Sequence, residues 1–138
     1  MKGYATSYGD ALDMQMYRQA LISFLKLGYT QAQAEAKARA VGDPGLGWMD
    51  NDLSDLKTPW VALPYEDWQA KFKTKSKAHK AKVRVTCNGV TFIGILGDTM
   101  PHKANIKNGA VIDLAPGAQK LIKRLPPFKI ANTTWEWA

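Results

Sequence analysis

Two apolar segments that each lead to an aspartate constrain the fold of this chain more than any other feature. Residues 90–96 reach Asp98 through a single glycine, and residues 110–112 reach Asp113 directly. Short apolar runs of this kind predict buried β-strands. Each carboxylate is therefore expected where a buried strand reaches the surface, and such positions commonly carry binding or catalytic residues.

Several other segments are also expected to form short strands. They are rich in β-branched and aromatic residues and cover residues 3–9, 58–64, 82–88, 128–130 and 133–137. Asn88-Gly89 is the strongest hairpin signal in the chain. Strands this short favour a small closed barrel, because closure leaves no unpaired strand edge. We expect a mainly β fold with a six-stranded barrel, and one short helix over residues 116–123 after the Asp113 strand.

The periodicity changes from that of strands to that of helices in an insertion at about residues 11–48. Apolar residues recur at helical spacing from Leu12 to Leu27. Thr30 and Gln33 then form a capping box that opens a second, alanine-rich helix. A hairpin of two such helices cannot hide its apolar face alone, so we expect it to pack on the barrel.

The composition excludes several kinds of protein. The 138 residues suffice for one domain, residues 1–138, whose core needs no disulfide. No apolar run approaches the ~20 residues that cross a membrane, and no hydrophobic signal segment opens the sequence. Cys87 is the only cysteine, which excludes an internal disulfide and fits a reducing compartment. Its place in an alternating strand predicts a small buried residue rather than a nucleophile.

No metal or cofactor site is expected from the sequence. His79 and His102 stand alone, without the cysteine or histidine spacing of a zinc site, and each is expected at the surface. The acidic segment 43–55 lacks the fixed spacing and the closing glutamate of a calcium-binding loop.

The chain is basic, with a formal net charge of +7 and a pI near 9.5. Such a charge attracts polyanions: nucleic acid, anionic lipid or an acidic wall polymer. Many of the lysines lie in residues 71–82, which have no period that would bury one face, so this run is either a solvated loop between strands or a docking patch. No motif with base-reading or stacking spacing accompanies it, and we expect no nucleic-acid partner.

Four short segments follow one another in an order that resembles double-psi β-barrels. They are residues 3–6 (GYAT), 60–68 (WVALPYEDW), 97–101 (GDTMP) and 111–118 (VIDLAPGA). In these segments the chain is similar to bacterial expansins, rare lipoprotein A domains and family 45 glycoside hydrolases. The resemblance covers most of the chain except the insertion, and it implies a double-psi β-barrel with an inserted helical hairpin. It leaves the function open, because this fold carries several activities.

The resemblance also implies roles for particular residues. Asp113 matches the acid with which family 45 hydrolases protonate the leaving oxygen, and which expansins keep. Asp98 matches a second acid shared by expansins and rare lipoprotein A domains, and Thr6 matches the first-strand hydroxyl of expansins. Asp10 falls close to the sequence position at which the hydrolases carry their catalytic base, and expansins have no such base.

Three departures from these families bear on the activity. A glycine rather than an aromatic residue precedes Asp10, and the helical insertion begins there. Thr99 replaces the arginine that usually follows the second acid in rare lipoprotein A domains, and Trp60 replaces the histidine before their Leu-Pro turn. Because of these differences, the lytic-transglycosylase activity known in rare lipoprotein A domains is less strongly expected for this chain.

Each acid also has a purely structural alternative. Asp98 can hold a turn at residues 97–101, as aspartates do in turns generally. Asp113 can accept hydrogen bonds from amides at the start of the following helix, and Asp10 can cap the first helix.

Several large side chains are candidates for contacts with a sugar chain. Trp48 lies beside two loop glycines and is the best stacking platform, and Tyr8 and Met100 are expected to line the groove. Trp60 and Trp135 fall in the middle of strands and are expected in the core.

The chemistry of glycosidic cleavage suits these acids, because it needs a proton donor at the leaving oxygen and a group that attacks or stabilises the sugar cation. Partial burial raises the pKa of a carboxyl, so Asp113, at the end of an apolar strand, is the expected donor. The nearby charge of Asp98 would raise this pKa further. Asp10 is then the candidate base, and without it Asp98 and Asp113 can still support a lytic mechanism.

The function favoured by the sequence is cleavage of a cell-wall polysaccharide by acid/base chemistry. Peptidoglycan is favoured over a cellulose-like chain, because a basic protein suits an anionic wall. Synthesis in the cytoplasm without a signal segment would fit a phage-type lysis enzyme, and we expect a monomer. One alternative is an expansin-like module that binds or loosens the wall without hydrolysis. A second is an inhibitor or interaction barrel whose helical hairpin covers the groove.

Overall fold

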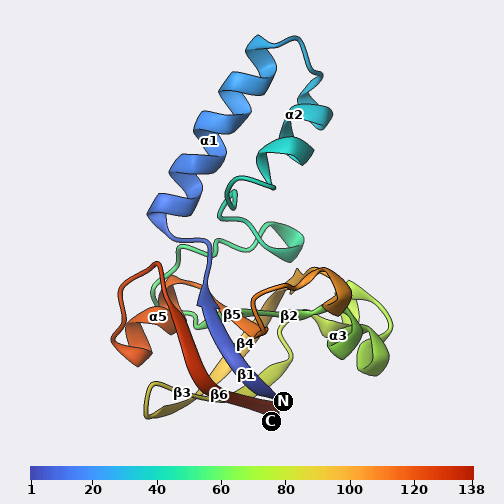
Figure 1. Ribbon diagram of the computed structural model, residues 1–138. Helices are drawn as coiled ribbons and strands as arrows, with labels where there is room; N and C mark the ends of the chain where they lie inside the picture. The colour runs from blue at the N-terminus through green and yellow to red at the C-terminus, as the bar shows by residue number, and fades with distance from the viewer.

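The computed structural model describes residues 1–138, in which short strands form a barrel and a pair of helices extends from it (Figure 1). In chain order the elements are β1 (Lys2–Ser7), α1 (Ala11–Lys26), α2 (Gln31–Ala38), β2 (Trp60–Pro64), α3 (Tyr65–Phe72), α4 (Lys75–Ala78), β3 (Lys82–Cys87), β4 (Val90–Met100), β5 (Ala110–Leu114), α5 (Pro116–Ile122) and β6 (Lys129–Trp137). Two short 3₁₀ helices cover Trp48–Asp50 and Lys103–Asn105.

The strands close into one barrel in the order β1-β5-β2-β4-β3-β6. β1 pairs with β5 and β2 pairs with β4 in parallel, whereas the other neighbouring pairs are antiparallel. Because the barrel is closed, no strand of it is left with an unpaired edge. The predicted fold, mainly β with a six-stranded barrel and an inserted helical hairpin, is confirmed.

The alternation of residues in β3 decides which side chains enter the core. Val83, Val85 and Cys87 are at most 1% exposed, whereas the residues between them face the solvent. Asn88 and Gly89 both take positive φ, 52° and 76°, as a two-residue hairpin turn requires. The predicted hairpin between β3 and β4 and the predicted burial of the cysteine are confirmed.

The barrel encloses a continuous apolar core of 18 buried residues. Members come from the strands and from the helices beside them, such as Trp68 of α3 and Ile122 of α5. Trp135 belongs to this cluster and is 5% exposed, and Trp60 is 7% exposed in a smaller buried cluster. The core positions predicted for these two tryptophans are confirmed. No helix in the chain combines the length and the apolar character that crossing a membrane requires.

β4 runs further than the sequence suggested. The sequence predicts a turn at residues 97–101, but β4 continues to Met100, and Asp98 lies within the strand. The prediction was wrong because the end of β4 pairs in parallel with β2, which supplies its backbone hydrogen bonds. Gly97 permits this pairing, since a Cβ at that position would lie 2.5 Å from the Trp60 ring.

Half of the lysine-rich segment at residues 71–82 is helical rather than loop. α3 continues to Phe72, and α4 follows after two residues. The Thr74 hydroxyl accepts a hydrogen bond from the Lys77 amide (3.3 Å) and caps α4. The lysines of both helices are exposed, so the helices form without burying a basic face.

The two inserted helices begin at the residues that the sequence indicates. Asp10 caps α1, with its Oδ1 accepting a hydrogen bond from the Asp13 amide at 3.2 Å. Thr30 and Gln33 form the capping box of α2, with both of its reciprocal hydrogen bonds present. These predictions are confirmed.

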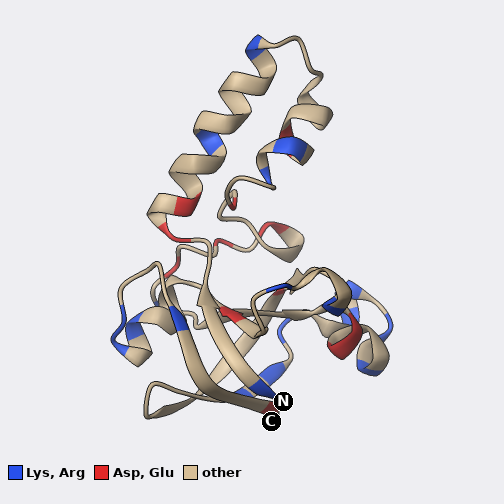
Figure 2. Cartoon of the chain, in the orientation of Figure 1, with Lys and Arg blue, Asp and Glu red and all other residues tan.

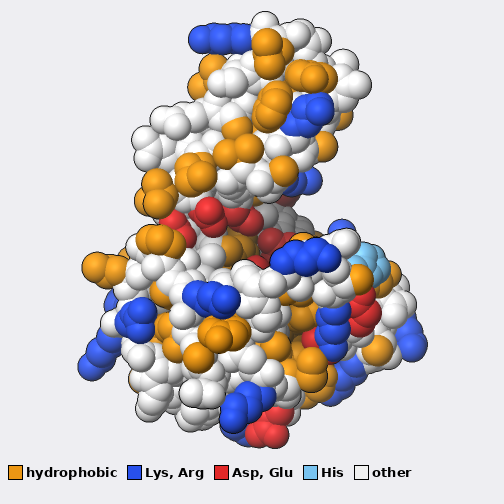
Figure 3. All heavy atoms as spheres, viewed as in Figure 1, with side chains coloured by type: hydrophobic (Ala, Val, Ile, Leu, Met, Phe, Trp, Pro, Cys, Tyr) orange, Lys and Arg blue, Asp and Glu red, His pale blue; other side chains and the backbone are white.

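The hairpin nevertheless extends away from the barrel instead of packing on it (Figure 1). The two helices pack against each other instead. Tyr17 of α1 and the small residues Ala34 and Ala38 of α2 are buried. The expectation that the hairpin packs on the barrel was therefore wrong. Apolar side chains remain on its surface, with Ile22 54% and Leu27 74% exposed (Figure 3).

Two isoleucines on strands test the position of the core. Ile112 of β5 is fully buried, whereas Ile93 of β4 is 40% exposed. Ile112→Ala should lower the free energy of unfolding by about 2–5 kcal/mol, because it leaves a cavity inside the barrel. Ile93→Ala should cost about 1 kcal/mol or less. Equal losses for the two variants in urea unfolding would contradict this assignment of the core.

Candidate functional site

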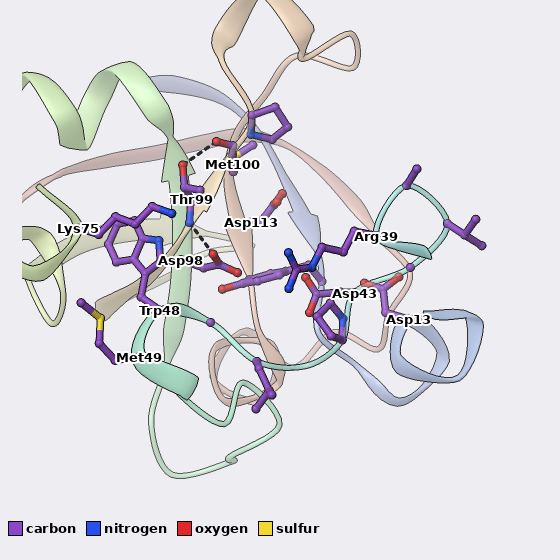
Figure 4. A pocket seen from close by; sticks show the side chains of 18 residues that line it. Asp13, Arg39, Asp43, Trp48, Met49, Lys75, Asp98, Thr99, Met100 and Asp113 are labelled. Atoms are coloured by element: carbon purple, nitrogen blue, oxygen red, sulfur yellow. Dashed lines mark hydrogen bonds between the residues drawn. The ribbon is translucent and has the colours of Figure 1, made fainter. Parts of the chain in front are cut away.

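A cavity of about 800 Å³ opens between the barrel and the base of the helical hairpin (Figure 4). Strands β4 and β5, with Tyr8 directly after β1, contribute its barrel side, and the segment that follows α2 contributes the opposite side. Figure 3 shows acidic side chains gathered in this hollow. The lining residues that carry polar or aromatic groups are Tyr8, Asp13, Arg39, Asp43, Trp48, Lys75, Asp98, Thr99 and Asp113.

Asp98 and Asp113 belong to one row of residues that crosses neighbouring strands. Thr6 of β1 is paired with Asp113 of β5, Asp113 with Ala62 of β2, and Ala62 with Asp98 of β4. Paired residues project to the same face of a sheet, and both carboxylates line the cavity. Because neighbouring strands lie about 4.8 Å apart, the two acids have Cα atoms about 10 Å apart, with one methyl group between them.

Burial in the protein raises the pKa of Asp98 and that of Asp113 to about 7. A hydrogen bond donated by the Thr6 hydroxyl to Asp113, and one donated by the Thr99 amide to Asp98 (2.8 Å), oppose this rise. The charge of Asp43 raises both pKa values further. Near neutral pH each carboxyl is poised between its protonated and ionised forms, which suits a group that transfers protons.

The Tyr8 hydroxyl is a buried donor without a partner. Tyr8 is 7% exposed, and no protein atom hydrogen-bonds its hydroxyl. Burial, followed by the charges of Asp98 and Asp113, raises its pKa well above the usual value, so it stays protonated. A buried polar group left unpaired costs about 1–3 kcal/mol, and such groups are rare in proteins. Because Tyr8 lines the cavity, its hydroxyl marks a position where a ligand oxygen can bind.

Most of the residues predicted for the site do line this cavity. They are Tyr8, Trp48, Asp98, Met100 and Asp113. Thr6 does not line it and reaches it only through its hydrogen bond to Asp113. Asp10 does not line it either: its side chain is turned to the α1 cap, and the residue is 8% exposed.

The structural alternatives considered for the acids have different outcomes. Asp113 does not cap α5, whose N-cap is Ala115 without a side-chain hydrogen bond. Asp98 holds no turn, although it accepts a hydrogen bond from the next amide in its strand. Asp10 is the N-cap of α1, as its structural alternative proposed.

Trp48 contributes more to the core than to an open surface. It is 6% exposed and packs edge-to-face on Trp68, with ring centroids 4.9 Å apart. This contact leaves little of the ring free for a sugar to stack on.

The insertion supplies ionisable residues that sequence reasoning missed, namely Asp13, Arg39 and Asp43. Asp43 accepts a hydrogen bond on Oδ1 from the Gly45 amide at 2.7 Å. Burial raises the pKa of Asp43 and that of Asp13. The only local signal is an aspartate within a Gly-Asp-Pro-Gly turn, and such a signal does not indicate which cavity the turn will face.

No three His, Cys, Asp or Glu side chains gather closely enough to hold a metal ion. The two histidines are engaged in other contacts. His79 hydrogen-bonds Asn51 (3.0 Å) and stacks on the Trp60 ring. His102 lies 2.8 Å from a carboxylate oxygen of Glu66.

Comparison with known proteins supports the fold. No family model matches the chain, and no curated protein sequence matches it significantly. Among solved structures the chain is similar to the Streptomyces papain inhibitor (SPI), with 20% sequence identity and a TM-score of 0.50. The match covers 99% of this chain and 91% of that chain. Similarity at this level supports a shared barrel fold, while the likeness to expansins, rare lipoprotein A domains and family 45 hydrolases stays a resemblance in sequence.

The raised pKa values of Asp98 and Asp113 predict how stability depends on pH. Between the ordinary aspartate pKa of 3.8 and about 7, the folded protein binds more protons than the unfolded chain. The contribution of these acids to the free energy of unfolding therefore falls as the pH rises from about 4 to about 7. Asp98→Asn and Asp113→Asn should each flatten this decline and be more stable than the wild type at pH 8.

Urea unfolding at a series of pH values measures this effect. Asp50→Asn removes an exposed aspartate outside the cavity and serves as the control for the loss of one charge. If the free energy of unfolding depended on pH in the same way in the wild type and in both cavity variants, the pKa values of these carboxyls would not be raised by burial.

Proposed function

We propose that the cavity cleaves a polysaccharide, with Asp113 as the proton donor. The observation that carries this proposal is the row across β1, β5, β2 and β4, which sets two carboxyls with a pKa of about 7 on either side of Ala62. Paired carboxyl groups that cleave glycosidic bonds stand about 5–9.5 Å apart. Side chains on Cα atoms about 10 Å apart are compatible with that range. The support for glycan chemistry comes from this site and not from the comparisons.

Each group of the site has a task in such a reaction. Asp113, with its pKa near 7, holds a proton at neutral pH far more often than an ordinary aspartate and can give it to the leaving oxygen. The Thr6 hydroxyl fixes the orientation of Asp113 by donating a hydrogen bond to it. Asp98, when ionised, stabilises the positive charge that develops on the sugar ring. The free hydroxyl of Tyr8 donates a hydrogen bond to a sugar oxygen.

The distribution of charge favours the glycan of an anionic cell wall. The chain has a formal net charge of +7, and Figure 2 shows basic residues on both the barrel and the hairpin, while many acidic residues gather where the two meet. A basic surface attracts an anionic wall. The acid-lined cavity favours uncharged sugar rings over the anionic groups of the same polymer. Peptidoglycan is therefore favoured over a cellulose-like chain.

Release of fragments from purified peptidoglycan tests this proposal. Asp113→Asn should lower the rate about 10²- to 10⁴-fold, because it removes the proton donor. Asp98→Asn should also lower it strongly, whereas Asp50→Asn, exposed and outside the cavity, should keep the wild-type rate. Cellulose treated in parallel compares the two polysaccharides. Wall binding without any released fragment would instead support the non-hydrolytic, expansin-like module.

The pH dependence of the same reaction provides a second test. The rate should fall as the pH rises above about 7, because Asp113 then loses the proton that it must donate. The rate is measured on one peptidoglycan preparation in buffers of constant ionic strength. A rate that keeps rising above pH 8 would argue against Asp113 as the acid.

A second candidate function is that of a protein-binding barrel. Two observations favour it: the similar structure is named as a papain inhibitor, and the hairpin exposes apolar side chains such as Ile22 and Leu27. Papain activity measured with increasing amounts of the protein tests this candidate, and stoichiometric inhibition would support it. Leu27→Ser should then weaken inhibition if the hairpin forms the contact, while leaving peptidoglycan cleavage unchanged.

A further inference from the structure

The carboxylate that the sequence offers as a base does not face the cavity. Asp10 is buried, and its Oδ1 accepts the hydrogen bond that caps α1. Hydrolysis of a glycosidic bond, however, needs a group that takes a proton from the attacking water. The base must therefore be another carboxylate that lines the cavity, and Asp13, Asp43 and Asp98 do so beside the proton donor.

Asp43 lies beside the place at which the sequence put the base. The segment after α2 returns to the foot of α1 so closely that a Cβ on Gly42 would lie 2.4 Å from the Asp13 carbonyl oxygen. This return brings Asp43 to the cavity (Figure 4). Its Oδ1 lies 3.9 Å from the position of a Cβ on Gly9, the residue that precedes Asp10. The insertion thus places an acidic side chain next to the end of β1.

The contacts of Asp43 leave one of its two carboxylate oxygens available to bind a water molecule. Oδ1 accepts the Gly45 amide hydrogen, and no protein group hydrogen-bonds Oδ2. Burial and the charges of Asp13 and Asp10 raise the pKa of Asp43, whereas the Gly45 amide and the charge of Arg39 oppose this rise. The charge of Asp43 in turn raises the pKa of Asp98 and that of Asp113. An ionised Asp43 therefore helps to keep the proton donor protonated.

We infer that Asp43 is the general base of this cavity and that it holds the water that attacks the sugar. The buried, unpartnered Tyr8 hydroxyl in the same cavity is an independent sign that a polar ligand binds there. This inference rests on the proposed glycan cleavage and extends it, since it assigns the base to the helical insertion.

The step balances with water as the only co-reactant. Asp113 gives its proton to the glycosidic oxygen, and the bond between that oxygen and the anomeric carbon breaks. The water oxygen bonds to the anomeric carbon, and the proton that it loses passes to Asp43. One fragment ends in a hydroxyl at the leaving oxygen and the other in a reducing sugar, and both acids then exchange protons with solvent.

Matched asparagine variants separate the two candidate bases. Asp43→Asn keeps an oxygen that can accept the Gly45 amide hydrogen and should lower reducing-end release from peptidoglycan about 10²- to 10⁴-fold. Asp10→Asn keeps a good N-cap residue and should retain activity. Asp50→Asn controls for the loss of an exposed acid just after the insertion. Far-ultraviolet circular dichroism and the midpoint of urea unfolding confirm that each variant is folded.

Chemical rescue distinguishes a base from a residue that merely shapes the cavity. Asp43→Ala should be inactive with water alone, and added azide should restore bond cleavage, because azide attacks without needing a base. The product is then a glycosyl azide, which mass spectrometry detects. Asp113→Ala, which lacks the proton donor, should not be rescued in this way on the same natural glycan.

The outcomes for the wild type and the variants can be told apart. If the wild type releases no fragments, the proposed function fails and this inference fails with it. If the wild type is active and Asp43→Asn is equally active, the base assignment alone is overturned. The same holds if Asp10→Asn, and not Asp43→Asn, abolishes the reaction, or if azide does not rescue Asp43→Ala.

Discussion

The pairing of β2 between β4 and β5 is the interaction on which the site depends. Ala62 is in register with Asp98 on one side and with Asp113 on the other, and backbone hydrogen bonds such as Ile95 N–H to Pro59 O (2.9 Å) fix this register. A slip of one residue would turn a carboxylate to the opposite face of the barrel wall. The register of three strands therefore defines the spacing of the acids, with the buried Ala62 between them.

Burial then gives these acids properties that a surface aspartate lacks. Burial of the two carboxyls in the protein raises their pKa values to about 7, and the charge of Asp43, on the insertion side, raises them further. Carboxyls of this kind weaken the fold, because the unfolded chain would ionise them at no cost. The apolar barrel core offsets that loss, which is a common relation between a stable scaffold and a strained site. The arrangement is thus better explained by function than by stability.

Features set by local interactions could be predicted from the sequence. Asn88-Gly89 produced a hairpin, and Thr30 with Gln33 produced a capping box, because each depends only on neighbouring residues. Asp98 and Asp113 were identified as acids of one cavity because each follows an apolar segment that joins the barrel. The direction of the hairpin was not predictable in this way, since it depends on how closely Gly42 approaches α1.

The sequence by itself determined the barrel, through short apolar segments whose unpaired edges require closure. It also determined the approximate ends of most strands and the two acids on β4 and β5. Only the tertiary structure decided that β4 runs through Asp98, that Asp10 turns to a helix cap, and that Asp43 returns to the cavity. These three outcomes depend on contacts between residues distant in the chain, and periodicity and turn signals carry no information about such contacts.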